Sequence, residues 1–167
     1  MRTVLITGAT SGIGKAAALA LAKLDYEVVF VARNKEKAEV VKSEINSSSG
    51  NQKISYILAD LCSKKQVGEC VSIFRSKHSR LDILINNAGV CLPERRITVD
   101  GMEEMFQINH LSYFMFSQLL TDLLQKGDDP RIVNVSSDAH ASGEFDPGNF
   151  QSEKKFSPFR HIEIPNY

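Results

Sequence analysis

The sequence predicts a single doubly wound α/β domain built on a parallel sheet. Apolar runs of strand length alternate with helix-length stretches through the first 135 residues, and a glycine-rich turn joins the first run to the first helix. Val, Ile and Leu fill these runs without regular polar alternation, which suits strands buried on both faces. With 167 residues, the chain is long enough for one core and too short for two ordinary domains.

Five strands are expected in chain order, separated by stretches of helix length. They cover residues 3–6, 27–32, 54–59, 81–85 and 131–135. The first helix is expected to begin at Ile13, and a further helix near Ser63. Lysine and glutamate alternate between residues 35 and 44, which is typical of a solvated helix face. The polar stretch 46–52 is expected to form a surface loop.

The glycine-rich turn has the sequence Thr7-Gly8-Ala9-Thr10-Ser11-Gly12-Ile13-Gly14. Glycines allow a tight turn, a close approach of backbone N–H groups to a ligand, and close packing of the new helix on the sheet. The N-terminus of that helix presents unpaired N–H donors to an anion. This turn predicts a site for a dinucleotide pyrophosphate, with an ordinary strand-to-helix turn as the alternative for a glycine pattern taken alone.

Charge and composition exclude several classes of partner. Twenty basic and twenty acidic side chains give no net charge, so no electrostatic footprint for nucleic acid is expected. The apolar runs are far below membrane-spanning length, and because the first strand begins close to Met1, no signal peptide or N-terminal anchor is expected. The three cysteines indicate a reduced, intracellular and most simply cytoplasmic protein, and the scattered histidines predict no metal site.

Five motifs in order resemble the short-chain dehydrogenase/reductases. They are the glycine-rich turn, Asp60-Leu61, Asn86-Asn87-Ala88-Gly89, Asn109 and Val135-Ser136-Ser137. The resemblance covers residues 1 to about 160, and Ser136-Ser137-Asp138-Ala139-His140 with Glu153-Lys154-Lys155-Phe156 looks most like the retinol-dehydrogenase-like branch. It implies a Rossmann-type, doubly wound parallel sheet that is incomplete at its C-terminal side.

The resemblance also implies where the cofactor lies. Asp60 and Leu61 would contact the adenine ring, although Asp60 could instead cap the helix that starts near Ser63. The run Asn86-Asn87-Ala88-Gly89 would stabilise the central strands and line the nicotinamide side, although a turn also uses amides and glycine. The implied cofactor contacts are Thr7, Gly8, Ser11, Gly12, Ile13, Gly14, Arg33, Asp60, Leu61, Asn87, Ala88 and Gly89.

The end of the second strand bears on the choice between NADP and NAD. An acidic residue there would accept hydrogen bonds from a free ribose 2′-OH. The sequence instead has Ala32-Arg33-Asn34, and the planar fork of an arginine suits the oxygens of a 2′-phosphate. Lys35 or Lys37 could assist. A lone arginine would be interpreted as a solvated loop residue, but with Arg33 in this position NADP is predicted in preference to NAD.

The reaction implied by the resemblance is hydride transfer between the nicotinamide and an alcohol or carbonyl carbon. In the family a Ser hydroxyl bonds the reacting oxygen and an Asn supports a proton relay; these roles fall on Ser137 and Asn109. Ser136 would be an ordinary hydroxyl at the strand end. A buried, hydrogen-bonded amide is the alternative for Asn109.

The family's Tyr-x-x-x-Lys motif is the main departure. In this branch it should fall near Ile162 and Asn166, where the chain reads His161-Ile162-Glu163-Ile164-Pro165-Asn166-Tyr167. Pro165 argues against a helix there, and neither His161 nor Tyr167 is expected to replace the proton donor. The sequence therefore predicts a partial domain over residues 1–160, a divergent tail over 161–167, and little or no turnover by these residues.

Two functions follow from these observations. The first is an NADP-dependent oxidoreductase for a lipophilic alcohol or carbonyl such as a retinoid or steroid, with the chain as the front part of a longer reductase. The second is a non-catalytic nucleotide-binding or interaction protein. The fifth strand would form a sheet edge with part of its apolar surface uncovered, which invites aggregation or pairing with another chain, either a full-length relative or a second copy.

Overall fold

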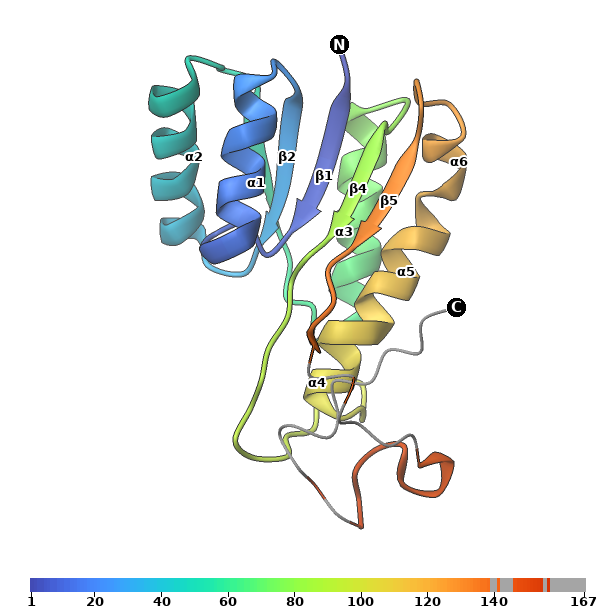
Figure 1. The fold of residues 1–167 in the computed structure, drawn as a ribbon. Coiled ribbons are helices and arrows are strands. Elements are labelled where there is room, and N and C mark those ends of the chain that lie inside the picture. Colours follow the sequence, from blue (N-terminus) through green and yellow to red (C-terminus); the bar gives the residue numbers. More distant parts are fainter. Residues whose placement is uncertain (139–140, 142–145, 155, 157–167) are drawn as a thin grey trace.

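The computed structural model describes residues 1–138, 141, 146–154 and 156. In this part of the chain, five strands form one parallel sheet in the order β3-β2-β1-β4-β5 (Figure 1). The strands are β1 (Thr3–Thr7), β2 (Glu27–Ala32), β3 (Ile54–Leu58), β4 (Ile83–Asn86) and β5 (Arg131–Asn134). The predicted doubly wound parallel sheet is confirmed, because the chain first runs outward from β1 to β3 and then returns to β4 on the other side.

Helices cover both faces of the sheet (Figure 1). α1 and α2 pack on one face, and α3, α5 and α6 pack on the other. The helices are α1 (Gly12–Lys23), α2 (Lys35–Ser49), α3 (Lys64–Lys77), α4 (Glu104–Phe106), the π-helix η1 (Gln107–Leu111), α5 (Ser112–Leu119), α6 (Thr121–Leu124) and the 3-10 helix η3 (Pro147–Asn149).

Alternate residues of the central strand β1 face the two layers. Ile6 packs in the cluster that contains Ala18 of α1, whereas Leu5 packs in the cluster that contains Phe74 of α3 and Phe116 of α5. All five of these side chains are fully buried. Each buried large apolar side chain contributes about 1.5–3 kcal/mol to folding, so the two layers together hold the sheet rigid beneath its carboxyl edge.

Most expected strand boundaries are met within a residue, but β4 begins two residues later than predicted. Asp82 is fully buried there, and its carboxylate accepts hydrogen bonds from Thr3 N at 2.7 Å and from Asp128 N at 2.7 Å. Leu81 N donates to the carbonyl of Leu123 at 3.0 Å. These contacts tie residues 81 and 82 to neighbouring segments before the ladder of β4 starts. The first helix begins at Gly12, one residue before the expected Ile13. The loop predicted over residues 46–52 is wrong for residues 46–49, because α2 continues to Ser49 and ends at the left-handed Gly50.

The strand β5 is an edge of the described sheet. Among the described residues it pairs with β4 alone, and all four of its residues are exposed. Ile132 and Val133 keep 45% and 44% of their surface open. This confirms the prediction that the fifth strand leaves apolar surface uncovered.

Residues 146–154 lie beside the long connection that follows β4, below the sheet in Figure 1. Arg95 Nε donates to the main-chain oxygen of Gln151 at 2.8 Å, and the side-chain oxygen of Gln151 accepts from Glu103 N at 2.8 Å. The rings of Phe106 and Phe150 meet edge to face, with centroids 4.5 Å apart. These contacts fasten η3 and the residues after it to the start of α4.

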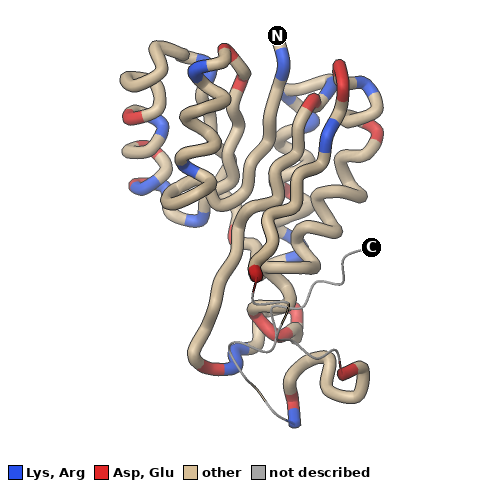
Figure 2. The backbone as a smooth tube through the Cα atoms, viewed as in Figure 1, with Lys and Arg blue, Asp and Glu red and all other residues tan. Residues whose placement is uncertain are grey.

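Basic and acidic residues are interspersed along the helices and loops in Figure 2. Several of them form ion pairs, such as Lys15 with Glu44 and Arg80 with Asp128. Within the described residues, none of the helices combines the length and the apolar character that crossing a bilayer requires.

Candidate functional site

A cleft of about 670 Å³ opens where the carboxyl ends of β1 to β4 meet. Ligands of open α/β sheets bind at this edge, outside the point where the strand order reverses. The cleft is lined by eleven of the twelve predicted cofactor residues: Gly8, Ser11, Gly12, Ile13, Gly14, Arg33, Asp60, Leu61, Asn87, Ala88 and Gly89. The motifs that lie far apart in the sequence are therefore brought to one site.

Two positions of the turn have no room for any residue larger than glycine. A Cβ at Gly8 would stand 2.7 Å from the Cα of Ala88, and Gly8 also has a φ of +68°. A Cβ at Gly14 would stand 2.4 Å from the side-chain nitrogen of Asn87 and 2.5 Å from the oxygen of Gly8. The turn, the start of α1 and the end of β4 are thus packed so closely that neither glycine leaves room for a Cβ.

The N-terminus of α1 faces this cleft without a capping side chain. Ser11 is the N-cap residue, but its hydroxyl forms no cap hydrogen bond, and the first turn holds no acidic residue. In α2 and α3, by contrast, Asn34 and Ser63 each accept a hydrogen bond from the first turn. The N–H groups and the dipole of α1 therefore remain available to an anion such as a pyrophosphate.

Thr7 is the predicted cofactor residue that does not line the cleft. It is fully buried, and its hydroxyl accepts hydrogen bonds from the main-chain N–H groups of Asn87 and Ala88, each at 3.0 Å. The side-chain amide of Asn87 in turn donates to the oxygen of Thr7 at 2.9 Å and to that of Gly8 at 3.1 Å. Thr7 therefore joins the ends of β1 and β4 and positions the residues that do line the cleft.

Arg33 and Asp60 stand at the ends of β2 and β3. Arg33 is exposed and lines the cleft, while the next residue, Asn34, uses its side-chain oxygen to cap α2 by accepting from Lys37 N at 2.7 Å. Asp60 accepts from Cys62 N at 3.0 Å. The alternative that Asp60 caps α3 is wrong, because Ser63 occupies the N-cap position and its hydroxyl accepts from the helix.

A smaller pocket of about 270 Å³ adjoins the cleft and holds both predicted catalytic residues. Asn109 and Ser137 line it together with Tyr113, and its lining shares Asn87, Gly89, Val90 and Val135 with the cleft. Ser137 comes from the segment directly after β5, and Asn109 comes from η1. The pocket therefore brings the two predicted catalytic residues together beside the cleft.

Both polar atoms of the Asn109 side chain form hydrogen bonds with the main chain of Val90. The side-chain oxygen accepts from Val90 N at 2.8 Å and the side-chain nitrogen donates to the oxygen of Val90 at 2.9 Å. Asn109 lies in a π-helical turn, a distortion that is common at functional sites. The hydrogen-bonded amide of the alternative is therefore present, but Asn109 is half-buried rather than buried, and it holds the loop after β4 against the pocket.

Tyr113 is a tyrosine of this pocket that lies one helical turn after Asn109. It keeps 7% of its surface exposed, and burial raises the pKa of its hydroxyl to about 12. An efficient proton donor or acceptor has a pKa near the working pH. Tyr113 is therefore poorly matched to general acid–base catalysis at neutral pH.

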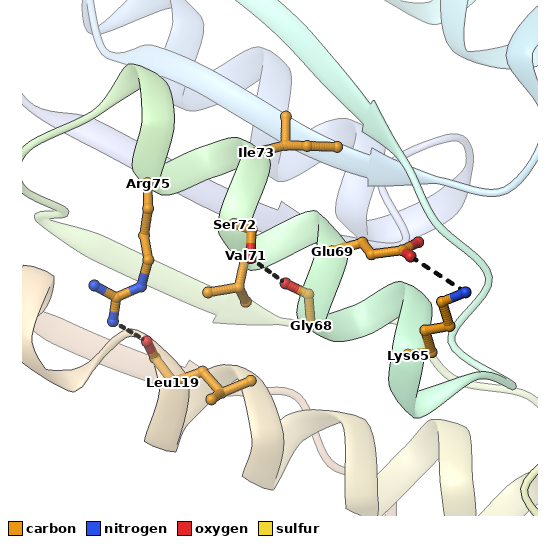
Figure 3. Close-up of a pocket in the computed structure, with 8 residues that line it drawn as sticks. All are labelled: Lys65, Gly68, Glu69, Val71, Ser72, Ile73, Arg75 and Leu119. Atoms are coloured by element: carbon orange, nitrogen blue, oxygen red, sulfur yellow. Dashed lines mark hydrogen bonds and ion pairs between the residues drawn. The ribbon is translucent and has the colours of Figure 1, made fainter.

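A separate hollow of about 740 Å³ lies between α3 and α5 (Figure 3). Its polar groups are paired with one another or with their own helix: Lys65 with Glu69, and the hydroxyl of Ser72 with the oxygen of Gly68. Arg75 donates to the oxygen of Leu119. The hollow shares no residue with the predicted motifs, so the cleft at the sheet edge is the candidate site.

Comparison with known proteins decides the family. The model of the family described as short chain dehydrogenase matches residues 2–154. The chain belongs to the short-chain dehydrogenase family. This confirms the resemblance that the five motifs indicated, and the matched span includes the cleft and the smaller pocket.

The relatives of this short-chain dehydrogenase include human polyprenol dehydrogenase, which is 37% identical and aligns over 94% of this chain and 49% of its own length. Human retinol dehydrogenase 13 is 39% identical over 92% of this chain and 47% of its own length. The chain spans about half the length of the curated relatives it matches. The likeness to retinol dehydrogenases also bears out the predicted branch.

Solved short-chain dehydrogenases share the fold. A short-chain dehydrogenase from Sphingobium yanoikuyae, solved in complex with NADPH, aligns with a TM-score of 0.72 and 30% identity over 85% of this chain and 56% of its own. The Pseudomonas aeruginosa RhlG/NADP active-site complex gives a TM-score of 0.72 and 30% identity over 83% and 56%. These likenesses confirm the predicted Rossmann-type sheet.

Several predictions for this short-chain dehydrogenase fall outside the described residues. They concern His140, the positions Ile162 and Asn166 expected for Tyr-x-x-x-Lys, and the tail 161–167 with His161 and Tyr167. Sequence reasoning missed Val90 and Tyr113 in the pocket. The signal for Tyr113 is its spacing of four residues from Asn109, which places both on one side of a helix.

Proposed function

We propose that the chain binds NADP(H) in the cleft, with the pyrophosphate at the N-terminus of α1 and the 2′-phosphate at Arg33. The observation that carries this proposal is that Arg33 lines the cleft at the end of β2, where Ala32 precedes it and Asn34 is occupied as a helix cap. A guanidinium at this position suits a phosphate, whereas a carboxylate would suit a free 2′-OH. The NADP and NADPH complexes of the solved relatives support it.

The remaining residues take roles that fit their places. Asp60 and Leu61 would contact the adenine, and Asn87, Ala88 and Gly89 would line the nicotinamide side. The bound cofactor supplies or accepts a hydride. Ser137 would donate a hydrogen bond to the reacting oxygen of the substrate, while Asn109 keeps the loop at Val90 in place.

The proposed substrate is a lipophilic alcohol or carbonyl compound of retinoid or steroid type. The names of the related polyprenol and retinol dehydrogenases support this class. Low turnover is proposed for these 167 residues, because none of the four tyrosines is followed by a lysine four positions later. The burial of Tyr113 and its raised pKa fit that proposal.

The second candidate is a non-catalytic nucleotide-binding protein that pairs with another copy through β5. The half-exposed Ile132 and Val133 on this edge strand favour it. An intracellular, cytoplasmic location is proposed for either function. Cys62 and Cys70 are free, which supports a reducing compartment.

A titration of NADPH with the purified chain tests the cofactor proposal. The chain has no tryptophan, so the nicotinamide fluorescence of NADPH reports binding without interference from protein emission. Saturable enhancement is expected with NADPH, and weaker binding is expected in a parallel calorimetric titration with NADH. Absence of binding of either nucleotide would refute the proposal, and tighter binding of NADH would refute the role of Arg33.

A further inference from the structure

Gln107 is a buried polar residue to which the proposed function gives no role. It is 1% exposed and lies in η1, two residues before Asn109. Its side-chain oxygen accepts from the hydroxyl of Thr98 at 2.6 Å, and its nitrogen donates to the Asp100 carboxylate at 2.8 Å and to the oxygen of Leu61 at 3.3 Å. A buried amide with three such partners fixes the positions of the segments it joins.

Asp100 extends this network to the start of α3. The same carboxylate oxygen that accepts from Gln107 also accepts from Lys64 N at 2.6 Å. Lys64 is the first residue of α3, and the turn before it holds Leu61. The position of the Leu61 turn therefore depends on Gln107 through two routes, directly at the carbonyl of Leu61 and indirectly through Asp100.

The network connects two parts of the site that lie at opposite ends of a bound dinucleotide. Leu61 lines the cleft where the adenine is proposed, and Asn109 lines the smaller pocket with Ser137. Between them stand the side chain of Gln107 and one turn of π-helix. A π-helical turn has an α-helical alternative, so a change in its hydrogen bonds can move Asn109 and the main chain of Val90 that it holds.

We propose that Gln107 is a positioning residue that couples the adenine end of the cleft to the pocket of Asn109 and Ser137. A ligand seated against Leu61 orders the Leu61 turn, the ordered turn holds the Gln107 amide, and the held amide stabilises the π-helical turn with the Asn109–Val90 pair. Coupling of this kind is reciprocal, so a group bound in the smaller pocket also favours binding at the adenine end. This inference rests on the proposed binding of NADP(H).

The test uses adenosine 2′,5′-bisphosphate, which carries the adenine and the 2′-phosphate but has no nicotinamide. Hydrogen exchange of the full chain is measured by NMR with and without this ligand. The amide of Val90 is the direct readout, because its N–H donates to the oxygen of Asn109. In the wild-type chain the ligand is expected to slow exchange at Val90 by about fivefold or more, and the share of this protection that is lost in a Gln107 variant measures the coupling.

Gln107→Met keeps the length of the side chain and removes its hydrogen bonds. It is expected to bind adenosine 2′,5′-bisphosphate and to protect the Leu61 turn, but to lose the added protection at Val90. Gln118→Met is the matched control, because Gln118 is exposed on α5 and should retain the wild-type response. If Gln107→Met does not fold, Asp100→Ala replaces it as the test, because Asp100 is half-exposed and is one partner of the Gln107 side-chain amide. This variant should show at most half of the added protection at Val90.

The outcomes separate the inference from the proposed function. Equal protection of Val90 in the wild-type chain and in a folded variant would overturn the coupling role of Gln107. Protection confined to the Leu61 turn in the wild-type chain would also overturn it, while leaving the cofactor proposal standing. If adenosine 2′,5′-bisphosphate does not bind the wild-type chain at all, the proposed function fails and the inference fails with it.

Discussion

Gly8 lies so close to the main chain of Ala88 that a Cβ added at Gly8 would stand 2.7 Å from the Cα of Ala88. This contact joins the turn after β1 to the turn after β4. It has no flexible side chain that could yield, because both sides of the contact are backbone. The shape of the cleft therefore depends on a glycine at this position.

Gly8→Ala is expected to abolish NADPH binding. It is also expected to lower the free energy of unfolding by more than the cost of placing an alanine in the left-handed conformation. Gly50→Ala is the matched control: Gly50 has a similar φ of +73°, but nothing lies within 4 Å of its added Cβ. The control should lose about 1–2 kcal/mol, the cost of the left-handed conformation, and keep its affinity for NADPH. Urea unfolding and fluorescence titration measure both effects. Equal losses in the two variants would contradict the packing argument.

Arg33→Ala is expected to weaken NADPH binding by about tenfold to one hundredfold, because a charge-assisted hydrogen bond contributes about 1.5–3 kcal/mol. Affinity for NADH should stay nearly constant, since NADH has no 2′-phosphate. Arg131→Ala is the control, because Arg131 is exposed at the opposite end of the sheet and pairs with Asp129. A similar loss for both nucleotides would show that Arg33 does not read the 2′-phosphate.

Ser137→Ala is expected to leave the rate of all-trans-retinal reduction by NADPH unchanged. Both chains should show only background consumption of NADPH, because in the proposed function Ser137 would only hydrogen-bond the reacting oxygen, and no tyrosine of these 167 residues is followed by a lysine four positions later. The assay follows NADPH absorbance, with heat-denatured protein as the background. A wild-type rate clearly above that of the variant would disprove the proposed low turnover.

The order of strands could be predicted from the sequence because buried parallel strands are continuous apolar runs. A strand boundary is hard to predict where a buried side chain forms hydrogen bonds to distant segments. Asp82 is such a case, since its carboxylate binds the N–H groups of Thr3 and Asp128, which lie far from it in the sequence. No local pattern marks an interaction of that range, so β4 was expected to begin too early.

The cleft was predictable and the polar network behind it was not. Glycines and strand ends identify a phosphate site locally, and eleven of the twelve predicted cofactor residues do line the cleft. The role of Gln107 depends on Thr98 and Leu61, which meet only in the folded chain. The π-helix at Asn109 was likewise missed, because residues 104–119 continue without a helix-breaking proline or glycine.

The stability that Asp100 contributes is expected to disappear in acid. The hydrogen bond from Lys64 N is the main cause that lowers the pKa of the carboxyl below its ordinary value of 3.8, with further help from Gln107 and the charge of Lys64. Because the folded pKa lies below the unfolded one, this contribution is present above pH 3.8 and is lost as the pH falls through the folded pKa. The wild-type chain should thus be more stable than Asp100→Asn near neutral pH.

Urea unfolding of both chains at about pH 7 and about pH 3 measures this difference. The gap between wild type and variant should narrow at the lower pH. Asp122, whose pKa is also lowered, mainly by Arg75, is present in both chains and cancels in the comparison. A gap that widens in acid would contradict the bond between Asp100 and the start of α3.

Self-association through β5 is expected to depend on the apolar side chains of that edge. Ile132 is 45% exposed on a strand that pairs with β4 alone within the described residues, so a second copy could extend the sheet there. Ile132→Lys places a charge on the edge, which blocks strand pairing. Sedimentation velocity over a concentration series should show that the wild-type chain associates and that the Ile132→Lys variant stays monomeric.

Val99→Lys is the control, because it changes a side chain that is 85% exposed and lies away from this strand. This variant should still associate. Loss of association in both variants would indicate a general effect of charge, and a monomeric wild-type chain would rule out pairing through β5.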